Sequence, residues 1–243
     1  MKLVFVLVIS LLTLAPQTSH AFGLRRPSAG SSTPTPTPNP LPTSTPVTID
    51  PVGMTLPTGA PACTSTDPNH ICIGLKLVSY TQSGVDSITQ AQALAMMAGV
   101  NQVWTQCNIG FQLEQYEAVD PTTQGLAYNT NWESDGDTVR RTFNDGTSFL
   151  VVAVGSLSGS TIAVSEEAGG ASVYGTLVEK LFATNPLTVG HELGHYQGLY
   201  HVSDSTNLMN PYIGANTEQL TSSQCDTARS TDYAEWQSMM RTP

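Results

Sequence analysis

The sequence predicts a mixed domain of the α+β class, and three features of the residue pattern lead to this prediction. Several short segments alternate apolar and polar residues, or are apolar throughout, as strands are. After the first of these segments, apolar residues recur at the three- and four-residue spacing of a helix. A second helical stretch follows the last predicted strand, and it opens a segment, residues 191–201, that contains three of the five histidines. This order is typical of a twisted mixed sheet that packs against helices.

The first predicted elements are a strand and a helix. Residues 71–82 alternate apolar and polar side chains and include β-branched residues, which indicates a strand. Residues 87–90, Ser-Ile-Thr-Gln, have the form of a capping box, so we expect a helix to begin there and to end near Cys107. One face of this helix is apolar and is formed by Leu94, Met97, Val100 and Trp104.

Four further strands are predicted after this helix. Residues 111–119 alternate again, and residues 148–154 are apolar almost throughout, as in a strand that is buried on both faces. Two shorter strands are expected at residues 160–164 and 171–176, on either side of a glycine pair.

The first 21 residues are predicted to be a signal peptide. Lys2 precedes an apolar run over residues 3–15, and Ser19 and Ala21 supply the small residues of a cleavage site before Phe22. We therefore expect a protein that is secreted, periplasmic or at the cell surface, where disulfides persist. No apolar run reaches the roughly 18 residues that cross a bilayer, so we expect no stable membrane insertion after cleavage.

Residues 22–62 are predicted to be a disordered linker rich in proline and threonine. Ten of the 16 prolines lie here, and this composition buries too little apolar surface to offset the entropy of ordering the chain. The remaining residues, 63–243, are numerous enough for one domain with a sizeable core.

The charge balance excludes one class of partner. Nine Lys and Arg residues stand against 19 Asp and Glu residues, which gives a formal net charge of -10. Few positive charges are available to displace counterions from a phosphate backbone, so we predict no binding to nucleic acid. We expect the protein to be a monomer.

The chemistry of the chain is concentrated in residues 191–201, His-Glu-Leu-Gly-His-Tyr-Gln-Gly-Leu-Tyr-His. On a helix, His191 and His195 lie one turn apart on one face, where both imidazoles can bind a single cation. Glu192 would lie beside this cation and could transfer protons without binding it. Gly198 can adopt a positive φ, which would end the helix and bring His201 back as a third ligand. Three nitrogens and one open position are typical of a catalytic zinc site.

This segment resembles the metzincin metalloproteases, whose signature H-E-x-x-H-x-x-G-x-x-H is met at every fixed position. The spacing to Met209 and Pro211 resembles the matrixin branch, as in a secreted peptidase of bacterial type. The resemblance covers about residues 185–213 and implies a metzincin-like catalytic domain: a twisted mixed β-sheet, an active-site helix, and a C-terminal helix after a methionine turn. It also implies that Met209 forms an apolar floor under the zinc, and that Pro211 and Tyr212 border a substrate pocket. Two features depart from matrixins: Val202 replaces the usual serine, and the P-R-C-G cysteine switch is absent.

The resemblance implies a secreted zinc-dependent endopeptidase that cleaves protein or peptide substrates. His191, His195 and His201 would hold one Zn²⁺, and Glu192 would act as general base and then as general acid. Two alternatives remain open: a secreted zinc-containing binding module without general proteolytic activity, and a zinc amidase that acts on cell-wall peptides. The intact Glu192 argues against the binding module, because metal binding alone does not require it.

Four cysteines in an exported chain predict two disulfides, with three pairings available. We favour Cys63 with Cys72, which closes a short loop, and Cys107 with Cys225, which ties the first helix to a C-terminal helix. That last helix is predicted from a second capping box at residues 221–224. In the alternative, Cys63 reaches the zinc as a latency switch.

Two oxygen-rich turns and a pair of glutamates complete the candidates. Residues 135–137 and 144–146 could hold Ca²⁺, but neither has the spacing of a defined calcium loop, and turn chemistry explains both. Glu166 and Glu167 lie near the strand that lines the substrate cleft in the family. By that resemblance, a peptide would add to the sheet as a further strand, and the two carboxylates would favour basic substrate side chains.

Overall fold

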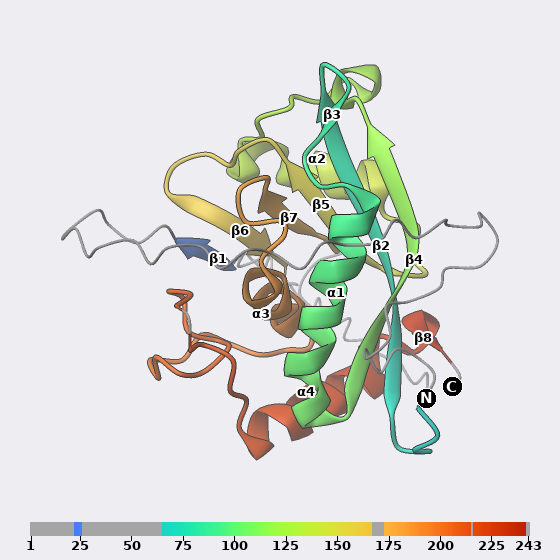
Figure 1. Ribbon diagram of the computed structural model, residues 1–243, viewed down its shortest axis with the longest axis vertical. Helices are drawn as coiled ribbons and strands as arrows, with labels where there is room; N and C mark the ends of the chain where they lie inside the picture. The colour runs from blue at the N-terminus through green and yellow to red at the C-terminus, as the bar shows by residue number, and fades with distance from the viewer. Residues whose placement is uncertain (1–21, 26–64, 167–172, 215, 242–243) are drawn as a thin grey trace, which may run out of the picture.

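The structure, a computed structural model, describes residues 22–25, 65–166, 173–214 and 216–241. Among these residues the strands form a mixed sheet in the order β1-β6-β7-β5-β2-β3, and β4 and β8 also pair with β2 (Figure 1). The strands are β1 Phe22–Arg25, β2 Ile71–Gln82, β3 Val85–Asp86, β4 Ile109–Val119, β5 Phe149–Val154, β6 Thr161–Ser165, β7 Thr176–Glu179 and β8 Met240–Arg241. Strands β4, β2, β5 and β7 run parallel, whereas β6 runs antiparallel to β7.

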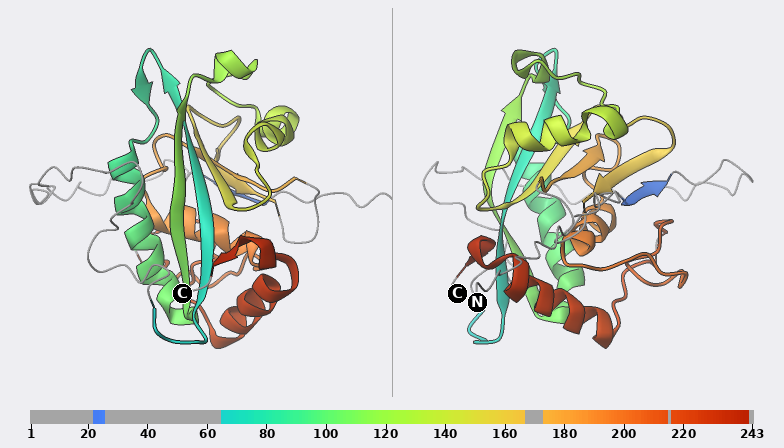
Figure 2. Two further views of the ribbon diagram at one scale, coloured as in Figure 1. Left: turned by 90° about the vertical axis from the view of Figure 1, so that its right-hand side faces the viewer. Right: turned by 180° about the vertical axis from the view of Figure 1, so that it is seen from behind.

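The helices cover both faces of this sheet. They are α1 Gln90–Trp104, α2 Trp132–Phe143, α3 Pro186–Tyr196 and α4 Ser222–Glu235, with short 3-10 helices η1 Thr105–Cys107, η2 Pro121–Gln124 and η3 Gln237–Met239. The chain passes from β2 through α1 to β4, and then returns through α2 to β5 on the other side of β2. Crossovers between parallel strands are right-handed, so this reversal of direction places α1 and α2 on opposite faces. Figure 2 shows α1 and α3 together on one face and α2 on the other.

Each face of the sheet has its own apolar core. The larger core lies under α1 and α3 and includes Trp104 and Met209. The smaller core lies under α2, where Val139 and Phe143 pack against the strands. The Trp104 indole N–H donates to the carbonyl of Gly190 at 3.1 Å, which joins α1 to α3 within the larger core. Within the described ranges, no helix has both the length and the apolar character needed to cross a membrane.

Most predicted elements are confirmed, although one helix begins later than expected. The predicted strands at residues 71–82, 111–119, 148–154 and 160–164 correspond to β2, β4, β5 and β6. The N-cap of α1 is Thr89 rather than Ser87, because Thr89 and Gln92 form the reciprocal capping box. The Ser87 N–H instead donates to the carbonyl of Tyr80 at 2.8 Å, which keeps Ser87 in the turn that follows β2.

The strand predicted at residues 171–176 was wrong, because β7 begins only at Thr176. Residues 171 and 172 lie outside the described part of the chain. The carbonyl of Tyr174 accepts a hydrogen bond from the Asn144 amide at 2.9 Å, and the carbonyl of Gly175 accepts one from Arg140 Nε at 2.7 Å. The carbonyls of Tyr174 and Gly175 therefore accept hydrogen bonds from side chains and not from a neighbouring strand.

The turn predicted at residues 135–137 was also wrong, because these residues lie inside α2. Glycine is unfavourable inside a helix, so Gly136 made a turn the simpler prediction. Both ends of α2, however, carry signals that are typical of a helix. Asn131 caps the first turn, which holds two acidic residues, and the last turn holds Arg140 and Arg141. Both charge placements complement the helix dipole.

The linker prediction does not hold for its first four residues, because Phe22–Arg25 forms β1 against β6. The register pairs Gly23 with Val164 and Leu24 with Ala163. The rest of the predicted linker, residues 26–62, lies outside the described residues.

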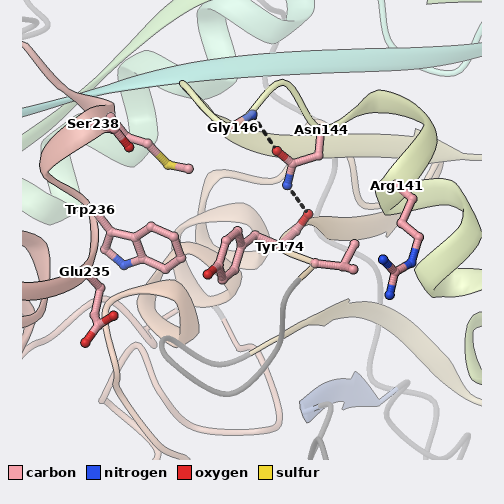
Figure 3. A pocket seen from close by; sticks show the side chains of 9 residues that line it. Arg141, Asn144, Gly146, Tyr174, Glu235, Trp236 and Ser238 are labelled. Carbon is pink, nitrogen blue, oxygen red and sulfur yellow. Dashed lines mark hydrogen bonds between the residues drawn. The ribbon is translucent and has the colours of Figure 1, made fainter.

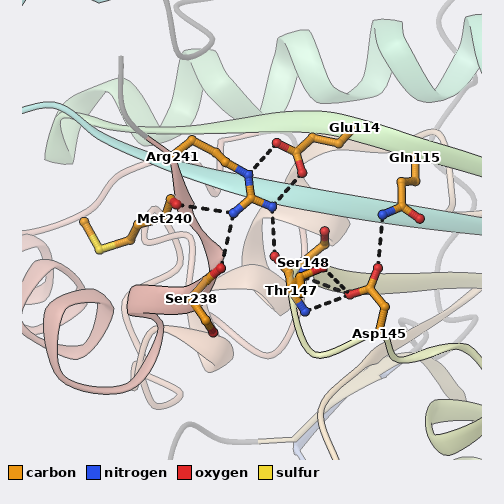
Figure 4. A network of polar contacts seen from close by, with 8 residues as sticks. All are labelled: Glu114, Gln115, Asp145, Thr147, Ser148, Ser238, Met240 and Arg241. Carbon is orange, nitrogen blue, oxygen red and sulfur yellow. Dashed lines mark hydrogen bonds and ion pairs between the residues drawn. The ribbon is translucent and has the colours of Figure 1, made fainter. Parts of the chain in front are cut away.

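The C-terminal strand is fastened to the sheet by an ion pair. Arg241 of β8 donates from Nε and Nη2 to the two carboxylate oxygens of Glu114 on β4, each at 2.6 Å (Figure 4). Strand β2 lies between them, and a Cβ on Gly74 of β2 would overlap the guanidinium. Glycine at this position therefore permits the pair to form.

A disulfide fastens the end of the first helix to the first turn of the last helix. Cys107 of η1 is bonded to Cys225 of α4, as predicted, and Thr221 caps α4 with the predicted capping box. Cys72 is also disulfide-bonded. Its predicted partner, Cys63, lies outside the described residues. Both the predicted Cys63–Cys72 bond and the alternative in which Cys63 reaches the zinc therefore stay predictions.

Candidate metal centre

The helix that carries two of the three clustered histidines is defined by local signals at both ends. At its start, the Asn185 side chain accepts hydrogen bonds from the N–H groups of Leu187 and Thr188, and Pro186 occupies the first turn. Proline suits this position because the first N–H groups of a helix have no partner within it. At its end, Gly198 has a φ of +74°, a left-handed conformation that reverses the chain as predicted.

The structure brings the three predicted histidines together. His195 Nε2 and His201 Nε2 each lie 3.1 Å from His191 Nε2. The possible ligand atoms of the three residues all lie within 4.8 Å of one another. Ligands about 2 Å from a shared tetrahedral zinc would lie about 3.3 Å apart, so this spacing fits such an ion. Within the described residues, no other group of three potential ligands is brought together in this way, and the calcium candidates at 135–137 and 144–146 are not.

Backbone carbonyls set the tautomers of the two helical histidines. His191 Nδ1 lies 2.6 Å from the carbonyl oxygen of Leu208, and His195 Nδ1 lies 2.8 Å from that of Leu199. A carbonyl only accepts, so each Nδ1 carries the proton and each Nε2 presents a lone pair. Two lone pairs that face each other at 3.1 Å repel unless a cation lies between them. The donor chemistry therefore fits a metal ion.

Burial keeps these imidazoles neutral. His191 and His195 are fully buried, and loss of solvent lowers the pKa of His191 well below its usual range and that of His195 to about 3. The pKa of the half-buried His201 is lowered for the same reason. Neutral imidazole is the form that binds a metal, so the protein offers its ligands without first losing a proton at neutral pH.

The predicted methionine turn lies directly beneath the active-site helix. Met209 is fully buried, and a Cβ built on Gly194 would lie only 2.5 Å from its sulfur. Gly194 therefore allows the turn to approach the helix, a role that the sequence analysis did not assign. The Val202 N–H donates to the carbonyl of Met209 at 3.0 Å, so the same turn also holds the segment beside His201.

Glu192 is a buried carboxylate without a hydrogen-bond partner among the described residues. Glu192 directly follows His191 in the helix, and its side chain is fully buried. Neither of its two carboxylate oxygens accepts a hydrogen bond from the described residues. Burial raises the pKa of Glu192 to about 8, and the nearby Ser165 hydroxyl and Arg140 guanidinium oppose the rise. The Ser165 hydroxyl makes its hydrogen bond with Thr176 at 2.6 Å. Strong perturbation beside a ligand cluster is typical of a proton-transferring group.

The expectation that Glu166 favours basic substrates was wrong. Glu166 is buried, and its carboxylate accepts a hydrogen bond from Arg140 Nη1 at 2.9 Å. The Arg140 side chain is also buried and reaches this position from α2. The charge of Glu166 is thereby compensated inside the protein, and Glu167 lies outside the described residues. Arg140 was not foreseen, because 26 positions separate the pair in the sequence.

The two predicted pocket residues lie close to the methionine turn. Pro211 is half-buried, and Tyr212 is 59% exposed, so its ring is available to a ligand. The Tyr212 N–H donates to the Asn210 side chain at 2.9 Å, which fixes the backbone at this point. Their role at the border of a substrate pocket stays a prediction.

A separate pocket of about 440 Å³ lies away from the histidines, between the end of α2 and the C-terminal segment (Figure 3). Arg141, Asn144, Tyr174 and Trp236 are among its lining residues. The Asn144 amide is already engaged with the carbonyl of Tyr174, and neither the three histidines nor Glu192 nor Met209 lines this pocket.

Comparisons with known proteins agree with this geometry. The sequence profile of the matrixin family of peptidases matches residues 126–232, which contain the histidine cluster and Met209. Curated protein sequences gave no match. Mirolysin in complex with compound 9 is similar in fold, with 12% identity, a TM-score of 0.55, and coverage of 66% of this chain and 91% of that chain. Mature mirolysin of Tannerella forsythia in complex with a cleaved peptide also matches, with 12% identity, a TM-score of 0.52 and the same coverage of 66% and 91%.

A looser match is metalloproteinase-II from Bacteroides fragilis, with 14% identity and a TM-score of 0.48 over 66% of this chain. The present chain spans about half of its length, 53%. The matrixin profile covers the histidine cluster, and the mirolysin structures are similar in fold over 66% of this chain. Over residues 126–232 the chain therefore resembles the matrixin family of peptidases, and its fold is similar to that of the mirolysin structures.

Proposed function

We propose that the protein is an exported zinc-dependent endopeptidase. His191, His195 and His201 hold one Zn²⁺, and Glu192 transfers protons during hydrolysis of a peptide bond. The observation that carries this proposal is the buried, unpartnered Glu192 carboxylate next to three histidines whose ligand atoms converge. A metal site with only a structural purpose has no need of such a group.

Zinc bound at this centre would supply the Lewis acidity that polarises a scissile carbonyl and acidifies water. Glu192 then accepts a proton at its carboxylate and later gives it to the departing amine. Burial is suited to both steps, because a carboxyl group with its pKa raised toward neutrality can take up and release a proton at ordinary pH. Met209 holds the ligands from below, since its turn bonds both the His191 and the His201 segments.

The substrate in this proposal is a peptide in extended conformation. One solved relative in fold, mature mirolysin, was captured with a cleaved peptide. The export of the present chain rests on the predicted signal sequence at residues 1–21, which lies outside the described residues. The disulfide between Cys107 and Cys225 supports an oxidising compartment.

The test compares the full chain with the variant Glu192→Gln, which keeps the shape of the side chain but cannot take up a proton. Zinc content is measured first, and cleavage of an unstructured protein and of a mixed peptide library is measured second. Both proteins should bind close to one zinc, because Glu192 is not a ligand. Cleavage by the variant should fall at least about 100-fold. Glu133→Gln, on the exposed side of α2, is the matched control and should cleave as the unaltered chain does.

The outcomes separate the proposal from its alternatives. If zinc binds and neither protein cleaves the library, the endopeptidase proposal fails, and cell-wall peptides test the amidase alternative. Inactivity toward those peptides as well favours a binding module. Absence of zinc from the unaltered chain contradicts the metal centre itself.

A further inference from the structure

The pocket between the end of α2 and the residues that follow α4 has no part in the proposed catalytic chemistry (Figure 3). Its volume of about 440 Å³ is within the range of sites that hold small ligands. Three separate stretches of the chain meet in it: the end of α2 with the turn after it, the residues before β7, and the end of α4 with η3. The pocket is therefore a product of the tertiary fold and not of one loop.

One wall of the pocket is aromatic and held in place. The rings of Tyr174 and Trp236 meet edge to face, with centroids 4.6 Å apart and planes at 85°. Trp236 is 2% exposed, and its indole N–H donates to the carbonyl of Tyr196 at 2.6 Å, which fixes it against α3. Tyr174 is half-buried and lines the pocket in front of this support. Apolar groups of a ligand can pack against such a wall without rearranging it.

The neighbouring wall is joined to this one by Asn144. Its amide donates to the carbonyl of Tyr174 at 2.9 Å, and its side-chain oxygen accepts from the N–H of Gly146 at 2.7 Å (Figure 3). These bonds tie the turn after α2 to the segment that carries Tyr174. A pocket whose walls are already connected loses less conformational entropy when a ligand binds.

Two opposite charges line the pocket without partners. Arg141, in the last turn of α2, and Glu235, the last residue of α4, are both exposed. The ion pairs formed within the described part of the chain involve neither of them. Figure 3 shows the two side chains on opposite sides of the Tyr174 ring. The pocket thus offers one positive and one negative group, with aromatic surface between them.

This arrangement selects a class of ligand. Arginine binds a carboxylate with two parallel hydrogen bonds, and a glutamate carboxylate accepts hydrogen bonds from an ammonium group. A ligand with a single charge would leave either Arg141 or Glu235 unpaired, and a polyanion would be repelled by Glu235. A short peptide with both ends free and apolar side chains has a carboxylate, an ammonium and an apolar middle, so it matches all three features.

We propose that this pocket is a second peptide-binding site, which holds a short apolar peptide by its free ends. The C-terminal carboxylate binds Arg141, the N-terminal ammonium binds Glu235, and the apolar side chains pack against Tyr174. The source of the peptide rests on the proposed function, because hydrolysis of a peptide bond by water gives one new carboxylate and one new ammonium. A chain that is cut twice releases a peptide with both, and the pocket takes up such products away from the metal centre.

The test uses three probes that differ only at their ends: trileucine, trileucine amide and N-acetyl-trileucine. Each is titrated calorimetrically into the full chain carrying Glu192→Gln, a substitution that prevents cleavage of the probe. Trileucine should bind about fivefold more tightly than either blocked form, which is the effect of one exposed charge pair.

Two substitutions in the pocket, made in the same protein, assign the ends of the probe. Arg141→Met should weaken the binding of trileucine about fivefold and remove the difference between trileucine and its amide, while acetylation still weakens binding. Glu235→Gln should remove the effect of acetylation and keep the effect of the amide. Glu133→Gln, at an exposed position in the first turn of α2 and outside the pocket, is the matched control and should change none of the affinities.

Three results would overturn the proposal: no binding of trileucine at millimolar concentrations, equal binding of free and blocked probes, or the same affinities in both pocket variants as in the control. The last result would place the probe elsewhere, for example at the metal centre. None of the titrations requires turnover, so the proposed function is tested separately. If the unaltered chain cleaves no peptide and the titrations give the expected differences, the catalytic function fails and the second site stands. If cleavage is found and the differences are absent, the second site is refuted and the catalytic function stands.

Discussion

Two regions of the molecule place their glutamates in opposite situations. Beside β8, Glu114 accepts two hydrogen bonds from Arg241 and keeps 22% of its side chain exposed. Within α3, Glu192 is fully buried and has no hydrogen-bond partner among the described residues. Burial without a partner penalises the charged form, so the region around α3 gives up stability that the region around β8 retains. The comparison teaches that interactions that stabilise this fold and groups suited to its chemistry lie in different places.

Glu166 lies between these two extremes, because it is buried as Glu192 is and paired as Glu114 is. Its side chain is 7% exposed, and Arg140 lies 2.9 Å away with 2% of its side chain exposed. In such a pair each charge has given up water and depends on the other. Removal of Arg140 should therefore show how much an unpaired, buried Glu166 lowers the free energy of unfolding.

The largest effect is expected from Arg140→Met, which would break the buried pair and leave Glu166 charged in the interior. We expect a loss of about 3–5 kcal/mol in the free energy of unfolding, measured by urea denaturation at pH 7. Arg141→Met is the matched control, because the neighbouring arginine is exposed, and it should change the free energy by less than about 0.5 kcal/mol. Equal losses for the two variants would contradict the view that burial makes the difference.

A smaller effect is expected from the titration of Glu192 in metal-free protein. The pKa of Glu192 is about 8 in the folded state and 4.5 for the exposed group, so at intermediate pH the folded state holds a proton that the unfolded state has lost. Stability contributed by this proton is fully present below pH 4.5 and is lost as pH rises through 8. The lowered pKa values of the three histidines have the opposite effect, because they make the folded state less stable as the pH falls. This effect is confined to pH values below about 6.5, the usual pKa of histidine.

Between pH 6.5 and 8 we therefore expect the unaltered metal-free protein to lose about 2 kcal/mol relative to Glu192→Gln. Thermal unfolding of both proteins in the presence of a chelator, at several pH values, measures this difference. Parallel pH profiles for the two proteins would mean that Glu192 is not held in the protonated form.

The smallest effect is expected from Arg241→Met, at the partly exposed pair. Solvent screens this pair, and Glu114 can be hydrated when its partner is removed, so we expect a loss of about 1 kcal/mol. The measurement is urea denaturation under the conditions used for Arg140→Met. A loss as large as that of Arg140→Met would remove the distinction between the buried and the surface pair.

Local patterns in the sequence were sufficient to predict the core of the site. The spacing of His191 and His195 places both imidazoles on one helical face, and Asn185 and Gly198 mark the ends of that helix. Strand β5 was recognisable from its apolar run, which the sheet buries completely. These features depend on backbone geometry within a few residues, so the sequence by itself determined them.

Only the tertiary structure decided which distant segments meet these elements. Arg140 of α2 reaches Glu166 at the end of β6, Gly194 admits Met209, and β1 adds to β6 at the edge beside α3. No periodicity encodes such contacts, because each depends on packing between segments that the chain brings together only when it folds. The sequence determined which residues could bind a metal and transfer protons, and the packing decided which of them are paired, buried or covered.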